Sequence, residues 1–177
     1  MKDYNIKISE AQPEDIKDVL EVQKITWLAT YVNEEYNITS ADIESKDFNS
    51  PARIKSWQDR LLTDRKLSNF WIAKDHNKIV AFCIANRELD KNKLVAIYVL
   101  PDYQGLGIGK KLIKQALAWC GSDKPIVLDV VIYNLKAKSF YEKFGFRELG
   151  PTPTEDLAML SSGKTLPEIR MIYNKLK

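Results

Sequence analysis

Residues 101–112 read PDYQGLGIGKKL, a segment in which single aliphatic residues separate three of the chain's seven glycines. A run rich in β-branched residues, KLVAIYVL, precedes it, and a run with helically spaced apolar residues follows. At such a strand-to-helix junction, unpaired backbone N–H groups and the positive end of the helix dipole favour an anion. Glycine lets the backbone come close to a phosphate because no Cβ stands in the way. The segment therefore predicts an anion-binding loop.

Two common phosphate loops do not fit the spacing of this segment. A G-x-x-x-x-G-K-[ST] loop that placed its lysine at Lys110 would need a glycine where Gln104 stands. A dinucleotide-binding G-x-G-x-x-G that began at Gly105 would need its third glycine at Lys110. The spacing that does occur is Q-x-x-G-x-G, over residues 104–109.

The flanking sequence has the periodicity of a mixed α/β domain. Short runs rich in β-branched and aromatic residues predict strands, and apolar residues at i, i+3, i+4 spacing predict helices. The expected strands are 4–8, 69–75, 78–89, 93–100, 125–133 and 169–176. The expected helices are 13–31, 40–63 with a break at Pro51, 112–120 and 137–144. Turn residues at 75–77 and 90–92 join three of the strands into an antiparallel meander.

Composition limits the class of protein. The length of 177 residues, of which 45% are hydrophobic, suits a single domain over residues 1–177. A net charge of +3 gives no reason to expect a nucleic-acid partner. No apolar run approaches a membrane span, and the polar N-terminus lacks the apolar core of a signal peptide, so we expect a cytoplasmic protein without membrane contact. Cys83 and Cys120 lie in apolar runs without ligand spacing, so we expect buried thiols and no metal site.

Gln104, Gly107 and Gly109 fit the pattern [RQ]-x-x-G-x-[GA], which resembles the acetyl-CoA pyrophosphate loop of the GNAT superfamily of N-acetyltransferases. Residues 134–146 read NLKAKSFYEKFGF and resemble a second motif of that family, N-x-x-A-x-x-x-Y-x-x-x-G-F. The two motifs occur in the family's order and on the expected strand-helix units. The resemblance implies an α/β fold with a central mixed sheet of about seven strands and helices on both faces.

The resemblance also implies an activity, that of an acyltransferase which moves acetyl from acetyl-CoA to a primary amine. In the implied mechanism the amine attacks the thioester directly, within a ternary complex. The acceptor would be a polyamine-like small amine or the N-terminus of a peptide or protein, and the sequence does not choose between them. The alternative is a non-catalytic domain that binds or senses acetyl-CoA. Folds of this kind commonly pair through an edge strand, so a homodimer is an open expectation.

The same resemblance assigns residues to the cofactor. The loop would donate backbone N–H groups to the pyrophosphate, and the strand before it would pair with pantetheine. Asn134 would cap the following helix and also contact the cofactor. The residues assigned to acetyl-CoA are Ile97, Tyr98, Val99, Gln104, Gly105, Leu106, Gly107, Ile108, Gly109, Lys110, Asn134, Tyr141 and Lys143.

Tyr141 matches the general acid of the family. The departing thiol has a pKa of about 8.5, so a phenol with a pKa of about 10 can return a proton to the thiolate at little cost. From periodicity alone, Tyr141 would be a core aromatic residue on an amphipathic helix. Its place seven residues after Asn134 and four before Gly145 favours the acid.

The general base is less well defined. Many family members carry a glutamate on the strand before the loop, but residues 93–99 contain no acid. Asp129 interrupts an otherwise apolar strand, where an unpaired carboxylate would be costly, and it is either the base or a paired structural acid. Glu88 and a water relay are the other candidates.

The resemblance implies an acceptor site whose wall is built by the first two helices, the loop between them and the segment between the last two strands. Residues 33–47 hold five acidic residues and one lysine, which is either a solvated face or a surface that attracts a cationic acceptor. Trp27 and Tyr31 could line the same mouth, although Trp27 also suits the core.

Overall fold

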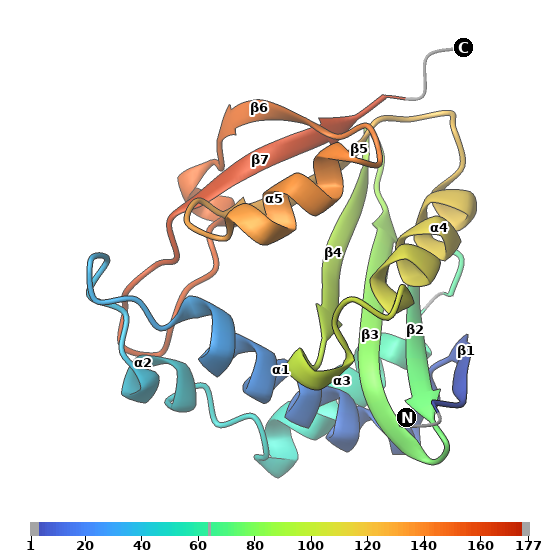
Figure 1. Cartoon of the computed structure of the whole chain (residues 1–177), viewed down its shortest axis with the longest axis horizontal. Helices are drawn as coiled ribbons and strands as arrows, with labels where there is room; N and C mark the ends of the chain where they lie inside the picture. The colour runs from blue at the N-terminus through green and yellow to red at the C-terminus, as the bar shows by residue number, and fades with distance from the viewer. Residues whose placement is uncertain (1–3, 64, 175–177) are drawn as a thin grey trace.

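The structure, a computed structural model, describes residues 4–63 and 65–174 and contains a seven-stranded sheet of order β1-β2-β3-β4-β5-β7-β6 (Figure 1). The strands are β1 Ile6–Glu10, β2 Ser68–Asp75, β3 Lys78–Arg87, β4 Asn92–Val99, β5 Ile126–Val131, β6 Arg147–Pro151 and β7 Glu168–Tyr173. The helices are α1 Ile16–Tyr31, α2 Ser40–Glu44, α3 Pro51–Leu62, α4 Ile108–Cys120 and α5 Leu135–Glu142.

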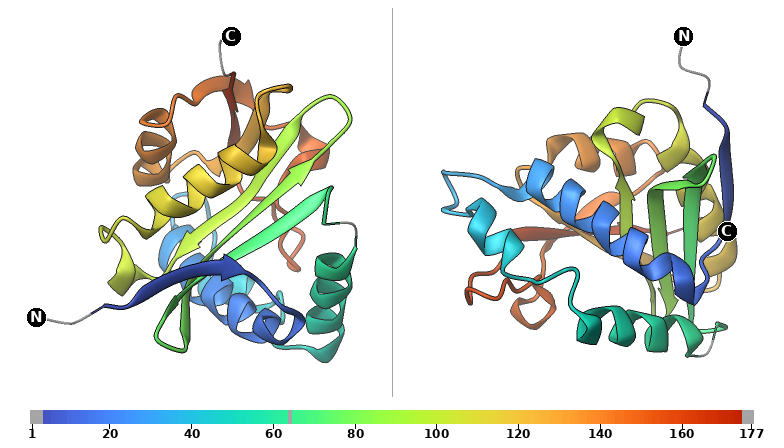
Figure 2. Two further views of the ribbon diagram at one scale, coloured as in Figure 1. Left: turned by 90° about the vertical axis from the view of Figure 1, so that its right-hand side faces the viewer. Right: turned by 90° about the horizontal axis from the view of Figure 1, so that it is seen from below.

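The sheet is mixed, as predicted. Strands β1 to β4 form an antiparallel meander, β4 and β5 pair in parallel, and β5, β7 and β6 are again antiparallel. Helices α1 and α3 pack on one face and α4 on the other (Figure 2). The expected α/β sheet with helices on both faces is confirmed.

Helix boundaries follow from the capping residues. The polar region expected to be helical over 40–63 is two helices, because Pro51 cannot continue a helix but is favoured in its first turn. Ser50 caps α3 by accepting from the backbone N–H of Arg53, at 3.3 Å. Thr39 and Asp42 form a reciprocal capping box at the start of α2.

One strand was not recognised in the sequence. Strand β6 has the sequence RELGP, which lacks alternating apolar residues, and four of its five residues are exposed at the edge of the sheet. It is identified by its pairing with β7, with Arg147 opposite Ile172. Strand β7 begins one residue earlier than expected, at Glu168, and the expected continuation over residues 175–176 lies outside the described residues.

Two apolar clusters stabilise the fold. The main core lies between the sheet and the helices α1 and α4, and it contains the buried free thiols of Cys83 and Cys120, as predicted. A second cluster joins the end of α1, residues 38–48 and the segment between β6 and β7. In the described part of the chain, no helix is long and apolar enough to cross a bilayer.

The main core predicts a sharp contrast between two leucines. Leu112 on α4 is 0% exposed, whereas Leu89 in the turn after β3 is 86% exposed. Leu112→Ala should lower the free energy of unfolding by about 3 kcal/mol, because a buried cavity is created, and Leu89→Ala by under ~0.5 kcal/mol. Urea denaturation measures both, and equal losses would contradict the described core.

Candidate active site

The parallel strands β4 and β5 separate soon after they meet. They pair only at Asn92–Ile126 and Lys93–Val127. A bulge at Val95, where β4 carries one residue more than β3, bends the strand near the point of separation. A cavity of about 660 Å³ opens beside the diverging strands, and residues of both β4 and β5 line it. The β5-facing backbone groups of β4 are therefore available to a ligand.

The glycine loop closes one end of this cavity. Gly107 is the residue before α4 and has a φ of 77°, while Gly105 has a φ of 82°, so both adopt backbone conformations that other residues rarely take. No side chain caps α4, which leaves its first backbone N–H groups directed to the loop. Gln104 donates to the carbonyl oxygen of Val99 at 3.1 Å and ties the loop to β4.

Lys136 adds a positive charge to the same end. Its ammonium donates to the side-chain oxygen of Gln104 at 2.6 Å, and both Lys136 and Lys110 line the cavity. The sequence did not single out Lys136, because α5 carries two lysines and nothing in their spacing shows which one faces the loop.

Tyrosines form the opposite end of the cavity. The hydroxyl of Tyr31 lies 3.2 Å from that of Tyr98, and Tyr133 donates to the carbonyl oxygen of Tyr31 at 2.8 Å. Tyr141 comes from α5 and packs on Phe146, with ring centroids 5.9 Å apart. Burial raises the pKa of Tyr141 well above its ordinary value and that of Tyr98 to about 12. These phenols stay protonated at neutral pH.

Most of the residues assigned to acetyl-CoA come together around this cavity. Leu106 and Lys143 do not, since Leu106 is 43% exposed on the outside of the loop and Lys143 lies exposed just after α5. The assigned residues that line the cavity are Ile97, Tyr98, Val99, Gln104, Gly105, Gly107, Ile108, Gly109, Lys110, Asn134 and Tyr141. In the described ranges, no group of three or more His, Cys, Asp or Glu side chains is arranged to bind a metal.

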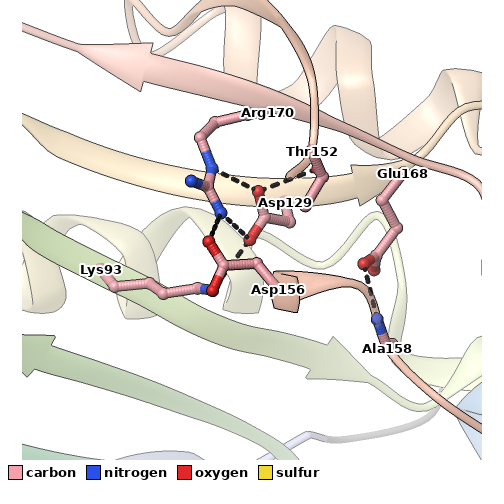
Figure 3. Close-up of polar contacts among 7 residues, drawn as sticks. All are labelled: Lys93, Asp129, Thr152, Asp156, Ala158, Glu168 and Arg170. Atoms are coloured by element: carbon pink, nitrogen blue, oxygen red, sulfur yellow. Dashed lines mark hydrogen bonds and ion pairs between the residues drawn. The ribbon is translucent and has the colours of Figure 1, made fainter. Parts of the chain in front are cut away.

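Asp129 lines the cavity but is bound to two cations (Figure 3). Its carboxylate accepts from Nε of Arg170 at 2.8 Å and from Thr152 at 3.0 Å, and Nζ of Lys93 lies 2.8 Å away. Burial alone would raise the pKa of Asp129, but the bonds from Arg170 and Lys93 hold it below its ordinary value. These are the contacts of a paired structural acid, and they weigh against Asp129 as a proton acceptor.

Glu88, another candidate for the general base, lies away from the cavity. It belongs to the turn between β3 and β4, at the end of β4 where that strand is still paired with β5. Its side chain is not among those that line the cavity. The sequence suggested Glu88 because it lies near the end of the strand that precedes β4.

Glu168 is a carboxyl that the sequence did not single out, because it directly follows Pro167 and precedes the apolar part of the last strand. It accepts a hydrogen bond from the backbone N–H of Ala158 at 3.1 Å. Burial, with a further contribution from the charge of Asp129, raises the pKa of Glu168 to about 7.

Lysines hold together the region in which the acceptor site was expected. Lys164, between β6 and β7, donates to the carbonyl oxygen of Asn37 at 2.7 Å and to Asp42 at 2.9 Å. Lys46 donates to the carbonyl oxygen of Met159 at 2.7 Å. We call these contacts the lysine clasp. The clasp gives Asp42 a structural role and holds the pKa of its carboxyl well below the ordinary value.

The remaining acids of this region are Glu34, Glu35, Glu44 and Asp47, which are exposed. Tyr31 lines the cavity, as expected. Trp27 is instead buried in the second cluster, with the ammonium of Lys46 5.1 Å from its ring centroid.

The splayed strands, the glycine loop and the tyrosine-lined cavity agree with the result of a family comparison, in which residues 23–146 match the acetyltransferase (GNAT) family. The chain belongs to the GNAT acetyltransferase family. The match covers both motifs of this GNAT chain up to Phe146 and leaves out β1, β6 and β7.

Curated relatives of this GNAT chain include proteins named for the acetylation of polypeptide amines. It is 32% identical over 104 residues to the peptidyl-lysine N-acetyltransferase YjaB of Salmonella typhimurium, a match that covers 58% of this chain and 63% of the relative. It is 24% identical over 111 residues to a putative [ribosomal protein bS18]-alanine N-acetyltransferase of Bacillus subtilis, covering 62% and 73%. The chain thus spans less than two thirds of the length of the Salmonella relative.

Solved GNAT structures share the whole fold. The PaiA N-acetyltransferase of Thermoplasma acidophilum, solved in complex with coenzyme A, has a TM-score of 0.74 at 23% identity, with 97% of this chain and 99% of that chain covered. An acetyltransferase of the GNAT family from Streptococcus pneumoniae has a TM-score of 0.70 at 19% identity, with 96% and 99% covered. At these sequence identities the likeness shows a shared fold alone.

The loop geometry predicts a specific effect of a methyl group at Gly107. Gly107→Ala should raise the Kd for CoA about tenfold, because a φ of 77° costs a residue with a Cβ about 1–2 kcal/mol and distorts the N–H groups. Gly121→Ala is the control, since Gly121 also has a φ of 77°, although with a different ψ, and lies at the other end of α4. Calorimetric titration with CoA should find the control unchanged, and an equal loss at both sites would contradict the assignment of the loop.

The pairing of Asp129 predicts a large effect on stability. Its side chain is 7% exposed, and Asp129→Ala should lower the free energy of unfolding by about 3 kcal/mol at pH 7, because buried cations lose their partner. Since the folded pKa of Asp129 is lowered, this contribution is present above the unfolded pKa of ~3.9 and is lost as the pH falls below it. Urea denaturation at pH 7 and pH 3 should show the difference shrinking at low pH.

Asp59→Ala provides the control for that measurement. Asp59 pairs with Lys55 on α3, but both side chains are more than half exposed. The Asp59→Ala substitution should lower the free energy of unfolding by under ~0.5 kcal/mol at either pH. A similar cost for the two aspartates would show that the Asp129 network is not structural.

Proposed function

We propose that this GNAT chain is an acetyl-CoA-dependent N-acetyltransferase that transfers acetyl directly to a primary amine within a ternary complex. One observation carries the proposal: a single cavity is lined by the glycine loop at one end and by Tyr141 and Tyr98 at the other, with the open edge of β4 between them. The groups proposed to bind the pyrophosphate, to pair with pantetheine and to donate the proton thus line the same cavity.

The loop suits the pyrophosphate of acetyl-CoA. The backbone N–H groups at the start of α4 and the helix dipole favour a phosphate, and Lys110 and Lys136 add positive charge. A Cβ at Gly109 would lie 3.5 Å from the ring of Phe140 and 3.8 Å from Cγ2 of Val99, which are ordinary van der Waals contacts, so α4 packs beside α5 and β4 at this point. The adenosine end of the cofactor would then lie outside the loop.

The strand edge suits pantetheine. Its amides can pair with backbone groups along residues 97–99 that β5 leaves unpaired, apart from the carbonyl oxygen of Val99, which accepts from Gln104. That pairing would place the thioester between the strands, where a backbone N–H of β4 stabilises the oxyanion that forms on the acetyl carbonyl. Most of the rate then comes from fixed position and from preorganised donors.

Tyr141 serves as the general acid. When the amine attacks the acetyl carbon, the C–N bond forms, the C–S bond breaks and the thiolate takes the phenolic proton of Tyr141. Its hydroxyl forms no hydrogen bond within the described residues, so it is available to a ligand. The raised pKa keeps this phenol protonated at neutral pH.

The acceptor is proposed to be an amine of a polypeptide. This choice rests on the relatives, whose names specify peptidyl-lysine and the alanine of a ribosomal protein. The exposed acids Glu34, Glu35 and Glu44 would favour a cationic polypeptide at the mouth. A polyamine-like small amine is the competing acceptor.

Release of the CoA thiol with a panel of amines tests the proposal. The panel contains a lysine peptide with a blocked N-terminus, an alanine-initiated peptide and spermidine. The wild type should release CoA fastest with a peptide. A chain that binds acetyl-CoA but releases none with any amine would be a non-catalytic binding domain, and the proposed function would be wrong.

Tyr141→Phe tests the proton donor. We expect kcat to fall about 100-fold, because the thiolate must leave without a proton, while the Kd for CoA stays unchanged. Tyr173→Phe is the matched control, since Tyr173 on β7 stacks on Phe146 and does not line the cavity. Full activity of Tyr141→Phe between pH 6 and pH 9 would remove Tyr141 from the mechanism.

A further inference from the structure

The side chain of Lys93 crosses from β4 to β5 at the point where the two strands separate. In the parallel pair, Lys93 lies opposite Val127. Its ammonium contacts the carboxylate of Asp129, two residues farther along β5, at 2.8 Å. Side chains two residues apart share a face of a strand, so Val127 and Asp129 point to the same side of the sheet. The Lys93–Asp129 ion pair therefore joins the strands just beyond their last paired residues.

The cavity begins directly past this ion pair. On β4 it is lined by residues 94–99, which follow Lys93, and on β5 by Asp129 and Val130. Asp129 thus belongs both to the ion pair and to the cavity wall. A contact that fixes Asp129 relative to β4 also fixes the width of the cavity at this end.

Asp129 is held in place from the side of β5 that faces away from β4. It lies opposite Arg170 in the antiparallel pair of β5 and β7. Arg170 donates to both carboxylate oxygens, from Nε at 2.8 Å and from a terminal nitrogen at 3.0 Å, and the hydroxyl of Thr152 donates at 3.0 Å. With Lys93 these donors fill the roughly four acceptor positions of a carboxylate (Figure 3). The carboxylate therefore has one position and one orientation.

Burial keeps the ion pair in this geometry. The side chains of Asp129 and Arg170 are buried, and that of Lys93 is 22% exposed. An exposed pair of this kind would be screened by solvent and free to change rotamer. A buried pair whose remaining hydrogen bonds are all formed has no comparable alternative, because a charge that left its partner would stay unpaired away from water.

The binding of pantetheine depends on this spacing. Its amides would have to reach the unpaired backbone groups of β4 while the rest of the chain passes beside β5. Hydrogen bonds weaken when the donor and acceptor move away from their preferred distance and angle. A β4 edge held at a fixed distance from β5 is therefore organised for the ligand before the ligand binds.

We propose that Lys93 is a positioning residue for acetyl-CoA, because its ion pair with Asp129 fixes the spacing of the strands between which pantetheine binds. The inference rests on the proposed acetyl-CoA site and extends it to a residue that does not line the cavity. Lys93 acts through Asp129 and does not contact the cofactor.

Lys93→Met tests the inference through the binding of two ligands. Methionine keeps an unbranched side chain without the ammonium, and Arg170 and Thr152 still hold Asp129, so the fold is retained. Calorimetric titration compares CoA with adenosine 3′,5′-bisphosphate, which has the nucleotide end of CoA but no pantetheine. The Kd for CoA should rise about tenfold, because the β4 edge is no longer held in place, and the Kd for the bisphosphate by less than about twofold. Loss of a positive charge acts on both anions, so the ratio of the two Kd values isolates pantetheine.

Lys74→Met is the matched control. Nζ of Lys74 also lies 2.8 Å from a carboxylate that is largely buried, that of Asp15. This pair joins β2 to the residue before α1, and neither residue lines the cavity. Urea denaturation checks that both variants are folded, and the Kd ratio should change in Lys93→Met alone. An unchanged ratio in Lys93→Met, or an equal change in both variants, would overturn the inference.

A double-mutant cycle tests whether Lys93 acts through Asp129. In Asp129→Asn the side chain keeps an oxygen that can accept from Arg170, but it has no charge to attract Lys93. In that background Lys93→Met should change the Kd ratio by less than about threefold, because the ion pair is already lost. A tenfold effect of Lys93→Met in the Asp129→Asn background would show that Lys93 acts in another way and would overturn the inference.

The inference and the proposed function can fail separately. A chain that acetylates an amine but keeps its Kd ratio in Lys93→Met would overturn the inference and leave the acetyltransferase proposal standing. A wild type that binds CoA but releases no thiol with any amine would overturn the acetyltransferase proposal, while the Kd ratio would still decide the inference. A wild type that binds no CoA would overturn both.

Discussion

The separation of β4 from β5 is the constraint on which the site depends. Two neighbouring strands normally satisfy each other's backbone groups along their whole length, but here pairing stops after Lys93 and Val127. The bulge at Val95 bends β4, while β3 continues to pair with it on the other side. Strand β4 is therefore held in the sheet by β3, while its edge toward β5 is left unpaired inside the molecule. A secondary amide of a ligand can form hydrogen bonds with that edge.

The sequence predicted the parts of the site that rest on local geometry. The loop over residues 104–109 needs positive φ at Gly105 and Gly107, and such demands leave a clear trace in the residue types. The motif required only Gly107 and Gly109, and the φ of 82° now accounts for Gly105 as well. Asn134 caps α5 by accepting from the N–H of Ala137, as its spacing indicated.

Long-range pairing left no such trace. Asp129 was identified as an unusual acid, but its partners Lys93 and Arg170 lie 36 and 41 residues away, and a choice between base and structural acid needed them in place. Glu168 gave no signal, since its burial depends on how β7 pairs with β5. Strand β6 was missed for the same reason, because pairing rather than apolar alternation defines it.

The region that the lysine clasp holds together and the region of the glycine loop can change to different extents over evolution. Acetyl-CoA would be bound largely by backbone groups, which survive many substitutions outside the glycines. The wall proposed for the acceptor would depend instead on side chains of the second cluster and on Lys46 and Lys164, which join segments over 100 residues apart in sequence. Substitutions there can reshape the wall while the main core is untouched. One acyl donor can thus be kept across relatives while their acceptors diverge.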